Sequence, residues 1–298
     1  MPNIPRPSRI RSLRRGTWLG LAVAGLGWAG AAEPPADKSQ FTLFHPTPVG
    51  SMRELSTDRP DTTESPITVD AGHYLLELSF ADYTYDKSRG VRHDVTIAAP
   101  FNFKVGLLNQ VDLQFVWDPY VSARTRTPGA GTVTVRGVGD AEVRLKINFW
   151  GNDGPQAGFG LTSFGLIPFL KIPIAKRDLG NGRVEGGLIF PFAVELPAGF
   201  DLGAMLETDF LRDNSNSRYG VEIVHSVTLG HTLFGGLRGY VEFVGISPLR
   251  TGRTYRAFYS TGLTYLVAKN VQLDVGTRIG LSSGADAFNI FSGLSVRF

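Results

Sequence analysis

The chain has 298 residues, contains no cysteine, and carries 36 glycines and 20 phenylalanines. The absence of cysteine excludes a disulfide framework, a thiolate metal site and a cysteine nucleophile. The formal net charge is +3. Whether this charge belongs to the mature protein depends on the positions of the charged residues along the chain.

The N-terminus has the pattern of a secretory signal peptide over residues 1–31. Five arginines, the last of them Arg15, precede the apolar run Trp18–Trp28, and small residues follow. This order is typical of an export signal with cleavage after Ala31. A membrane-anchoring helix is the alternative, although the run is shorter than the roughly 20 residues that span a bilayer. Removing the five arginines subtracts five from the net charge of +3 and leaves −2, so a nucleic-acid partner is not expected.

Residues 32–71 form an irregular segment before the first regular pattern. The segment is rich in proline and shows neither a period of two nor one of 3.6 residues. Four of its charged residues are candidates for a plug in a barrel lumen: Asp58, Arg59, Asp61 and Glu64. Arg59 in such a plug would bind a wall carboxylate through two parallel hydrogen bonds. The alternative is a free periplasmic tail.

From Gly72 onward polar and apolar residues alternate, most clearly between Gly139 and Trp150. Even positions from Asp140 to Asn148 are polar or charged, and the odd positions between them are apolar. A period of two predicts a β-strand with one wet face and one apolar face. One strand of a soluble sandwich would show the same pattern, but this strand also has the length needed to cross a bilayer at a tilt, about 9–11 residues.

The same alternation recurs and predicts an all-β fold, an antiparallel up-and-down transmembrane barrel of about twelve strands over residues 72–298. An even number of strands is typical of bacterial single-chain barrels. The predicted strands are Tyr74–Tyr85, Val91–Val105, Val111–Val121, Val138–Trp150, Gln156–Leu170, Gly186–Leu196, Phe200–Phe210, Tyr219–Leu229, Leu233–Ile246, Tyr255–Val267, Val271–Leu281 and Phe288–Phe298.

The predicted links between strands differ in length at the two ends of the barrel. Links after even-numbered strands are short, for example Gly151–Pro155, whereas several links after odd-numbered strands are longer. This asymmetry is typical of periplasmic turns and extracellular loops. The longer links Ser122–Gly137 and Lys171–Glu185 are candidates for gating.

The charged face of the strands is expected to line the lumen, since a charge at the lipid-facing midplane costs about 2–4 kcal/mol. The residues expected along the solute path are Asp94, Lys104, Asp112, Asp140, Glu142, Arg144, Lys146, Glu222, Arg238, Glu242, Asp274 and Arg278. Their functional interpretation is a polar path that selects by charge and size. The alternative is a set of cross-strand ion pairs that stiffen the wall. Twelve strands predict a narrow lumen that side chains or a plug can close.

The sequence predicts no catalytic centre, no metal site and no cofactor. His225 and Ser226 are adjacent, but neighbours in a strand point to opposite faces and cannot form a nucleophile–base pair inside the lumen. A lipid hydrolase in the barrel wall is therefore the least favoured alternative. The glycines around Asn181 precede no predicted helix, so a phosphate-binding loop is not expected.

Several motifs are spread over the whole of the expected mature chain. They are Thr57-Asp58-Arg59-Pro60-Asp61 with Glu64-Ser65-Pro66, Gly137-Val138-Gly139-Asp140 leading into Arg144-Leu145-Lys146, Glu185-Gly186-Gly187-Leu188 with Leu196-Pro197, and the closing strand Phe288–Phe298. Together they resemble the outer-membrane transporter family of the MetA-pathway of phenol degradation. The resemblance implies an outer-membrane barrel and a solute connected with the degradation of aromatic compounds.

We therefore expect a barrel in the Gram-negative outer membrane for passive or gated passage of a small, aromatic or hydrophobic solute. The alternative from another class is a sealed structural or adhesive barrel with no transport role. The expected partners are outer-membrane lipids, the solute, and the barrel-assembly machinery. That machinery would recognise the amphipathic strand that ends in Phe298.

Overall fold

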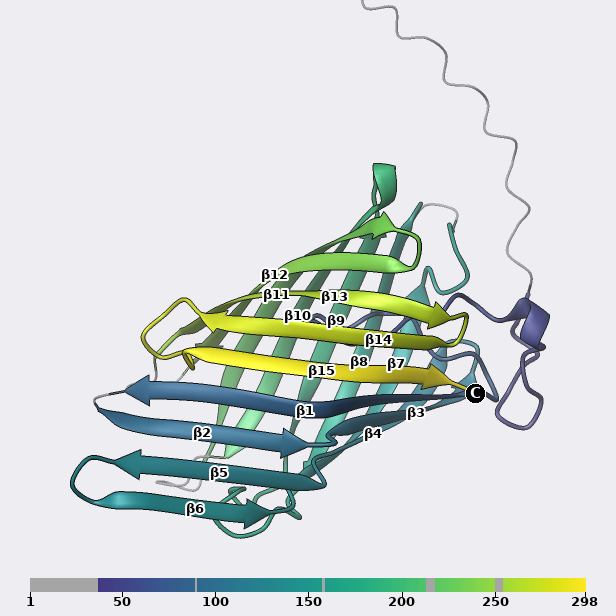
Figure 1. The fold of residues 1–298 in the computed structure, drawn as a ribbon. Helices are drawn as coiled ribbons and strands as arrows, with labels where there is room; N and C mark the ends of the chain where they lie inside the picture. Colours follow the sequence, from purple (N-terminus) through teal and green to yellow (C-terminus); the bar gives the residue numbers. More distant parts are fainter. Residues whose placement is uncertain (1–36, 89, 157–158, 213–217, 250–253) are drawn as a thin grey trace, which may run out of the picture. The chain divides into compact units, whose positions relative to one another are not determined.

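The chain folds into a closed antiparallel β-barrel (Figure 1). The computed structural model describes residues 37–88, 90–156, 159–212, 218–249 and 254–298. The expected signal peptide, residues 1–31, lies outside the described residues. Within the described ranges, no helix is long and apolar enough to cross a membrane.

Fifteen strand segments make up the sheet. They are β1 (Tyr74–Ser88), β2 (Val91–Ala98), β3 (Phe101–Leu108), β4 (Val111–Trp117), β5 (Tyr120–Thr127), β6 (Gly131–Gly137), β7 (Ala141–Trp150), β8 (Thr162–Ile172), β9 (Glu185–Glu195), β10 (Phe200–Arg212), β11 (Tyr219–Phe234), β12 (Leu237–Pro248), β13 (Arg256–Ala268), β14 (Val271–Gly280) and β15 (Phe288–Arg297). Two single 3-10 turns, η1 (Val49–Ser51) and η2 (Pro197–Gly199), are the helical elements of the described residues.

The fifteen segments form twelve strands of the wall, because three strands are interrupted. β1 pairs with β3 along its first half and with β2 along its second half, so β2 and β3 together make one bent strand. β4 with β5, and β6 with β7, are related in the same way. Pairing of β1 with β15, from Leu75↔Arg297 to Tyr85↔Phe288, closes the ring. The prediction of a twelve-stranded antiparallel barrel is confirmed.

The predicted loop Ser122–Gly137 is wrong, because these residues form most of β5 and all of β6. Register pairs from Val121↔Gly137 to Thr127↔Gly131 join the two strands around the turn at residues 128–130. The alternating threonines and valines of β6 suit a pleated strand. As Figure 1 shows, β5 lies beside β2 and β6 lies beside β5, so the two strands continue the sheet beyond β1 and β2 at that end.

Most of the short links lie at one end of the barrel, which we call the periplasmic end. They are residues 109–110, 196–199, 235–236 and 269–270. The fifth link differs from the prediction: β7 ends at Trp150 and β8 begins only at Thr162, so the strand predicted from Gln156 starts later. We call the opposite end the extracellular end.

The alternation along the strands places apolar side chains outside and polar side chains inside. Phe115, Val143 and Leu273 are exposed on the outer surface, whereas Asp112 and Lys146 are at most 1% exposed inside the barrel. A soluble protein shows the reverse arrangement. An apolar outer band with a polar interior is typical of a barrel surrounded by hydrocarbon.

Candidate functional site

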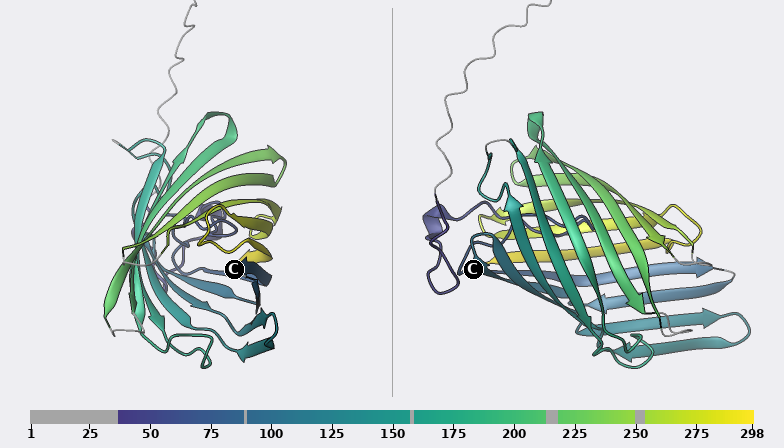
Figure 2. Two further views of the ribbon diagram at one scale, coloured as in Figure 1. Left: turned by 90° about the vertical axis from the view of Figure 1, so that its left-hand side faces the viewer. Right: turned by 180° about the vertical axis from the view of Figure 1, so that it is seen from behind.

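Residues 53–71, which we call the lumen segment, run inside the barrel. Figure 2 shows this purple stretch of chain enclosed by the strands. The segment forms no strand of the wall. Instead, its backbone and side chains bind inward-facing residues of the wall at successive levels, and these contacts define the candidate site.

Asp58 lies at the centre of a buried ionic cluster. Lys146 Nζ lies 2.8 Å from each carboxylate oxygen of Asp58, and Lys104 Nζ contacts the same carboxylate. Lys104 also donates to Glu77 Oε1 at 2.7 Å, and that oxygen accepts the backbone N–H of Asp58 at 3.0 Å. The lysines are 2% and 1% exposed. Both ammonium groups therefore depend on these carboxylates for charge compensation.

Three acidic residues of the lumen segment, Asp58, Asp61 and Glu64, differ in how firmly they are ionised. Burial alone would raise the pKa of Asp58, but the two neighbouring ammonium groups outweigh burial and hold that pKa well below its usual range. Burial, together with Glu242, raises the pKa of Asp61 well above its usual range. Burial, together with Asp58, raises the pKa of Glu64 to about 7 although Arg144 acts in the opposite direction.

Arg59 binds Asp274 of β14 through two parallel hydrogen bonds. Nε donates to Oδ2 at 3.0 Å, and Nη2 donates to Oδ1 at 2.7 Å. Nη1 donates to Ser79 Oγ at 2.6 Å, and the guanidinium lies 6.0 Å from the ring centroid of Phe291. A Cβ at Gly293 would collide with this guanidinium, so glycine leaves the room that the pair occupies. The geometry fixes Arg59 to one position on the wall.

Glu242 of β12 binds Thr62 and Thr63 of the lumen segment. Its Oε1 accepts the backbone N–H groups of Thr62 at 2.9 Å and Thr63 at 2.8 Å, and the Thr63 hydroxyl at 2.8 Å. Arg278 Nη2 donates to Thr62 Oγ1 at 2.7 Å, and Thr63 Oγ1 lies 2.7 Å from Ser226 Oγ. One wall carboxylate thus satisfies backbone donors that would otherwise lie buried without acceptors.

Glu64 shares an arginine with the wall. Arg144 Nη1 donates to Glu64 Oε1 at 2.7 Å, and Arg144 Nη2 donates to Glu142 Oε2 at 2.7 Å. The guanidinium also lies 5.8 Å from the ring centroid of Phe169. One cation therefore pairs with two carboxylates, one from the lumen segment and one from the wall.

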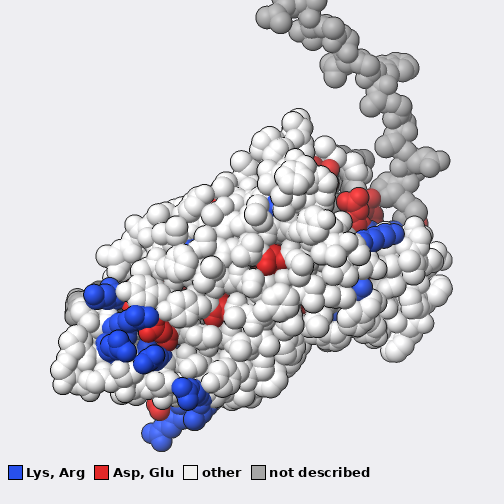
Figure 3. Space-filling model, in the orientation of Figure 1, with Lys and Arg blue, Asp and Glu red and all other residues white. Residues whose placement is uncertain are grey.

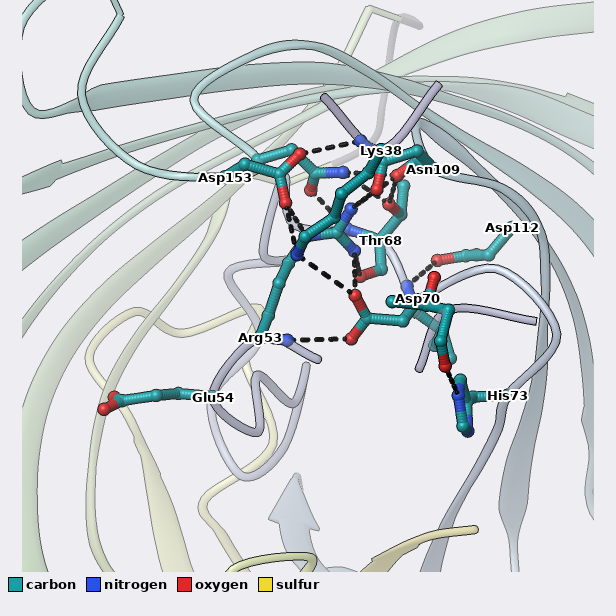
Figure 4. A network of polar contacts seen from close by, with 12 residues as sticks. Lys38, Arg53, Glu54, Thr68, Asp70, His73, Asn109, Asp112 and Asp153 are labelled. Atoms are coloured by element: carbon teal, nitrogen blue, oxygen red, sulfur yellow. Dashed lines mark hydrogen bonds and ion pairs between the residues drawn. The ribbon is translucent and has the colours of Figure 1, made fainter. Parts of the chain in front are cut away.

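A second network holds the lumen segment at the periplasmic end (Figure 4). Arg53 Nε donates to Asp153 Oδ1 at 2.9 Å, while its two Nη atoms donate to the carbonyl oxygens of Thr68 at 3.0 Å and Asn109 at 2.7 Å. Lys38 Nζ lies 2.8 Å from Asp153 Oδ1. Burial opposes ionisation of Asp153, but these neighbours outweigh it and lower its pKa. Sequence reasoning missed this network because its residues lie in irregular stretches and turns without periodicity.

Two predicted path residues lie toward the periplasmic end. Asp112 of β4 accepts the backbone N–H of Val69 at 3.0 Å and is fully buried. Arg238 of β12 pairs with Asp201 of β10, and both side chains are more than two-fifths exposed. Asp112 thus belongs to the contacts of the lumen segment, whereas Arg238 lies at the mouth of the barrel.

Two further predicted path residues lie toward the extracellular end. Lys171 Nζ lies 3.2 Å from Asp140 Oδ2. Arg256 Nη2 donates to Glu222 Oε1 at 2.6 Å. These acidic side chains form cross-strand or near-strand ion pairs and do not contact the lumen segment, so the structure does not bring them together with Asp58.

Asp94 is not a lumen residue, which corrects the prediction from the sequence. Asp94 lies opposite Tyr85, and Tyr85 lies opposite Phe288, which is exposed on the outer surface. Residues directly opposite in an antiparallel pair share a face. The interruption at Ala99, whose φ is 54°, reverses the alternation between β2 and β3. Lys104 therefore faces inward and Asp94 faces outward.

The inner wall from β8 to β13 is apolar in part. Its buried cluster comprises Ile167, Ile189, Met205, Val224, Val244 and Phe258. A cavity of about 160 Å³ adjoins this cluster at Phe258, and its other lining residues are Asp82, Thr84, Arg278, Asp286 and Asn289. Among the described residues, no group of three or more potential ligand side chains could hold a metal ion. The lumen therefore combines an apolar wall with polar groups.

Comparison with known proteins gives a family and a fold. A family model described as "Putative MetA-pathway of phenol degradation" matches residues 57–298. The COG4313 outer membrane channel from Pseudomonas putida F1 is similar in structure, with a TM-score of 0.59 and 13% sequence identity over 82% of this chain and 100% of that chain. At this identity the likeness shows a shared outer-membrane barrel fold.

Two other solved structures are similar at lower scores. The NanC porin has a TM-score of 0.46 and 8% identity over 75% of this chain and 98% of that chain. The CymD monoaromatic hydrocarbon channel has a TM-score of 0.40 and 9% identity over 76% of this chain and 87% of that chain. Comparison with curated proteins gives no match.

Proposed function

This chain belongs to the MetA-pathway family of phenol degradation, and on that premise we propose that its outer-membrane barrel mediates passive or gated passage of a small, aromatic or hydrophobic solute. The observation that carries the proposal is a segment of the chain that runs inside the barrel and is tethered to its wall, and we take this segment to close the lumen. A barrel that is closed by a separate segment can open without any change in its wall.

The number of strands supports this proposal. Eight-stranded barrels have interiors that side chains fill, whereas barrels of 16–18 strands enclose open channels. A twelve-stranded barrel lies between these sizes, so its lumen has room for one additional chain segment. Removal of that segment would leave a narrow path for small solutes.

The contacts of the lumen segment support gating by displacement. The segment is held by side-chain ion pairs such as Arg59–Asp274, and the ladders between neighbouring strands do not include it. Breaking these contacts would therefore leave the ring of paired strands intact. The link between β8 and β9, residues 173–184, is a second proposed gating element, because the Lys176 N–H donates to the Val138 carbonyl at 3.0 Å across the break between β6 and β7.

The class of solute follows from the family and from the inner wall. The family description concerns phenol degradation. The apolar cluster from β8 to β13 offers an aromatic or hydrophobic molecule a surface on which to pack. Polar side chains around the cavity at Phe258 would bind a hydroxyl group of such a molecule.

Single-channel conductance of the refolded protein in planar bilayers tests the proposal. The comparison is between the wild type and a deletion of residues 33–65, which removes Asp58, Arg59 and Glu64. We expect small or rare openings for the wild type and discrete conductance that rises on deletion. Heat-modifiable gel mobility is the control for folding of both forms.

Silence of both folded forms would contradict the proposed passage and favour a sealed structural or adhesive barrel. The observation that favours this second function is the compensation of buried charges, for example of Lys104 and Lys146 by Asp58. In that case the ion pairs would serve only to stiffen the wall and the extracellular links would carry the function.

Passage, and not catalysis, is the proposed activity. Ser226 is buried in the lumen beside Thr63, whereas the neighbouring His225 points to the other face and lies near the Tyr255 hydroxyl. These two residues therefore cannot form a nucleophile–base pair. The similar solved structures named above are two channels and a porin.

Recognition of the last strand by the barrel-assembly machinery is also part of the proposal. Phe298 exchanges backbone hydrogen bonds with Tyr74 at 2.8 and 2.9 Å, and its ring stacks on the Tyr74 ring at a centroid distance of 5.9 Å. The Phe298 side chain is 57% exposed on the folded barrel. Substituting Phe298 by alanine should therefore slow insertion more than it destabilises the inserted barrel.

A further inference from the structure

Cations gather on the outward-facing surface at the extracellular end of β1, β2, β5 and β6. Figure 3 shows this group in blue over the far ends of these strands. The register of the strands assigns to it the following residues, which we call the outer basic surface: Lys87, Arg92, Arg124, Arg126 and Arg136.

Cross-strand pairing brings these cations together in rows. Lys87 lies opposite Arg92, and Arg92 lies opposite Arg126, so three positive side chains stand side by side on three strands. Arg124 lies opposite Asp94 in the next row. Because Asp94 faces outward, the whole surface faces away from the lumen, and the solute path does not explain it.

The protein compensates this charge only in part. Asp94 accepts hydrogen bonds from Arg92 Nε at 2.8 Å and Nη2 at 2.7 Å, and it is the one carboxylate that shares this face within the described residues of the four strands. Like charges directly opposite one another destabilise a sheet. Lys87, Arg124 and Arg126 are nevertheless exposed on this face. An anion from outside the chain would remove this repulsion.

The position of the surface relative to the membrane identifies the source of that anion. Tyr83 and Tyr85 lie on the same face of β1, and Tyr85 comes two residues before Lys87. The Tyr83 hydroxyl donates to Asp94 at 2.6 Å, and the Arg92 guanidinium lies 5.1 Å from the Tyr85 ring centroid. Tyrosines are enriched at the membrane–water interface. Lys87 lies about 7 Å beyond Tyr85 along the strand, in one row with Arg92 and Arg126. Arg124 lies in the row of Tyr85, and Arg136 lies in the row of Tyr83. The tyrosines therefore place the cations at the membrane–water interface and just beyond it, where the outer-leaflet headgroups lie.

We propose that the outer basic surface binds the phosphate groups of the phosphorylated glycolipid that forms the outer leaflet of the Gram-negative outer membrane. Guanidinium groups bind phosphate oxygens in a bidentate manner. Neighbouring strands hold paired side chains about 5 Å apart, so two arginines such as Arg92 and Arg126 can reach one phosphate. The inference rests on the outer-membrane location of the barrel and is independent of solute passage.

The test measures binding of defined lipids to the folded full-length mature barrel by native mass spectrometry. The probes are lipid A with two phosphates, the same lipid A after enzymatic removal of its phosphates, and phosphatidylglycerol. The variant is Arg124→Gln with Arg126→Gln. The matched control is Arg177→Gln with Arg183→Gln, which removes the same charge from the exposed link between β8 and β9.

The affinity of the Arg124/Arg126 variant for bisphosphorylated lipid A is expected to fall at least about tenfold, since each cation near an anionic lipid surface contributes about fivefold. The control variant should stay within about twofold of the wild type. Removing the phosphates from lipid A should abolish the difference between wild type and variant. Lys87→Gln, a single exposed change, provides a second variant should the double variant fold poorly.

Three results would each overturn the proposal. The first is unchanged lipid A binding by the correctly folded Arg124/Arg126 variant. The second is an equal loss in both double variants, since a general charge effect would then suffice. The third is an equal loss of phosphatidylglycerol binding, which would show attraction to any anionic lipid and no preference for the phosphorylated glycolipid.

Discussion

The Asp58 carboxylate compensates two lysines that water does not reach. Replacing it by asparagine would leave Lys146 without its 2.8 Å partner and would leave Lys104 with Glu77 alone. Removing one member of a buried ion pair costs about 3–5 kcal/mol. We predict that Asp58→Asn releases the lumen segment and raises amide hydrogen exchange over residues 56–66 by about 100-fold or more, whereas the strands remain protected.

Asp61→Asn is the matched control for this prediction. Burial and the neighbouring Glu242 raise the pKa of Asp61, so its side chain is close to the neutral state that asparagine resembles. Amide exchange of residues 56–66 should therefore change by less than about threefold. An increase as large as that of the Asp58 variant would show that any polar change loosens the segment, and the specific role of Asp58 would be disproved.

The pairing of Arg59 with Asp274 shows which features of single residues can be predicted from the sequence and which cannot. Alternation places Asp274 on the inward face of its strand, and the composition of residues 56–66 suggests that Arg59 enters the lumen. The sequence does not contain the register of twelve strands around a ring. Which carboxylate meets Arg59, 215 positions away, follows only from the folded structure.

At the scale of strands, periodicity predicts the elements well but not their interruptions. All twelve predicted strands correspond to strands of the wall, because a period of two persists along most of their length. A single residue in a left-handed conformation, Ala99, reverses the two faces of one strand. Periodicity therefore predicts a lumen position for Asp94, whereas its side chain lies on the outward face of the barrel. Pro100, which follows Ala99, is the local signal of this break, because proline cannot donate to the ladder of a central strand, but it does not specify that the two faces exchange.

The β5–β6 extension is expected to be dispensable for the barrel. The Gly139 N–H donates to the Asp118 carbonyl at 2.8 Å where β4 and β7 part, so a four-residue loop can join them there. We predict that replacing residues 120–137 by Asn-Gly preserves heat-modifiable folding and changes the melting temperature by less than about 5 °C. The variant should also lose lipid A binding, since Arg124 and Arg126 leave with the extension.

If the shortened barrel melts as the wild type does and still binds lipid A, the expected loss of lipid A binding is disproved. If the shortened barrel fails to fold, the expectation that β5 and β6 are dispensable is disproved, and β2 then needs β5 as a neighbour. Insertion of Asn-Gly at the turn of residues 128–130, which keeps both strands, is the control for the effect of loop length.

For the whole molecule, the charges inside the barrel and those on its outer surface are arranged differently. Inside the barrel, the lumen segment meets acidic and basic wall residues that compensate one another, as Arg59 does with Asp274. Outside, the outer basic surface carries five cations and one carboxylate. The inner charges therefore fix the lumen segment to the wall of the barrel, whereas the outer charges have no such partner within the chain and are proposed to bind an external anion.

The proposed closed state, with the lumen segment bound to the wall, is expected to depend on pH through Glu64. Burial and Asp58 raise the pKa of Glu64 to about 7 in the closed state, despite Arg144, from about 4.5 in water. A raised carboxyl pKa means that closure takes up a proton, so the stabilisation is complete below pH about 4.5 and is lost as pH rises to about 7. Asp58 does not oppose this trend, because its lowered pKa affects closure only at more acidic pH.

We therefore predict that open probability in planar bilayers rises as pH increases from about 4.5 to about 7. Asp61 acts in the same direction, because its pKa is also raised. Glu64→Gln should weaken this dependence, since glutamine cannot lose a proton, and should lower open probability at pH 7 relative to the wild type. Glu54→Gln is the control, because Glu54 lies in the same segment and only its backbone carbonyl approaches Arg297, at 3.5 Å. An unchanged pH profile in the Glu64 variant would exclude Glu64 as the titrating group.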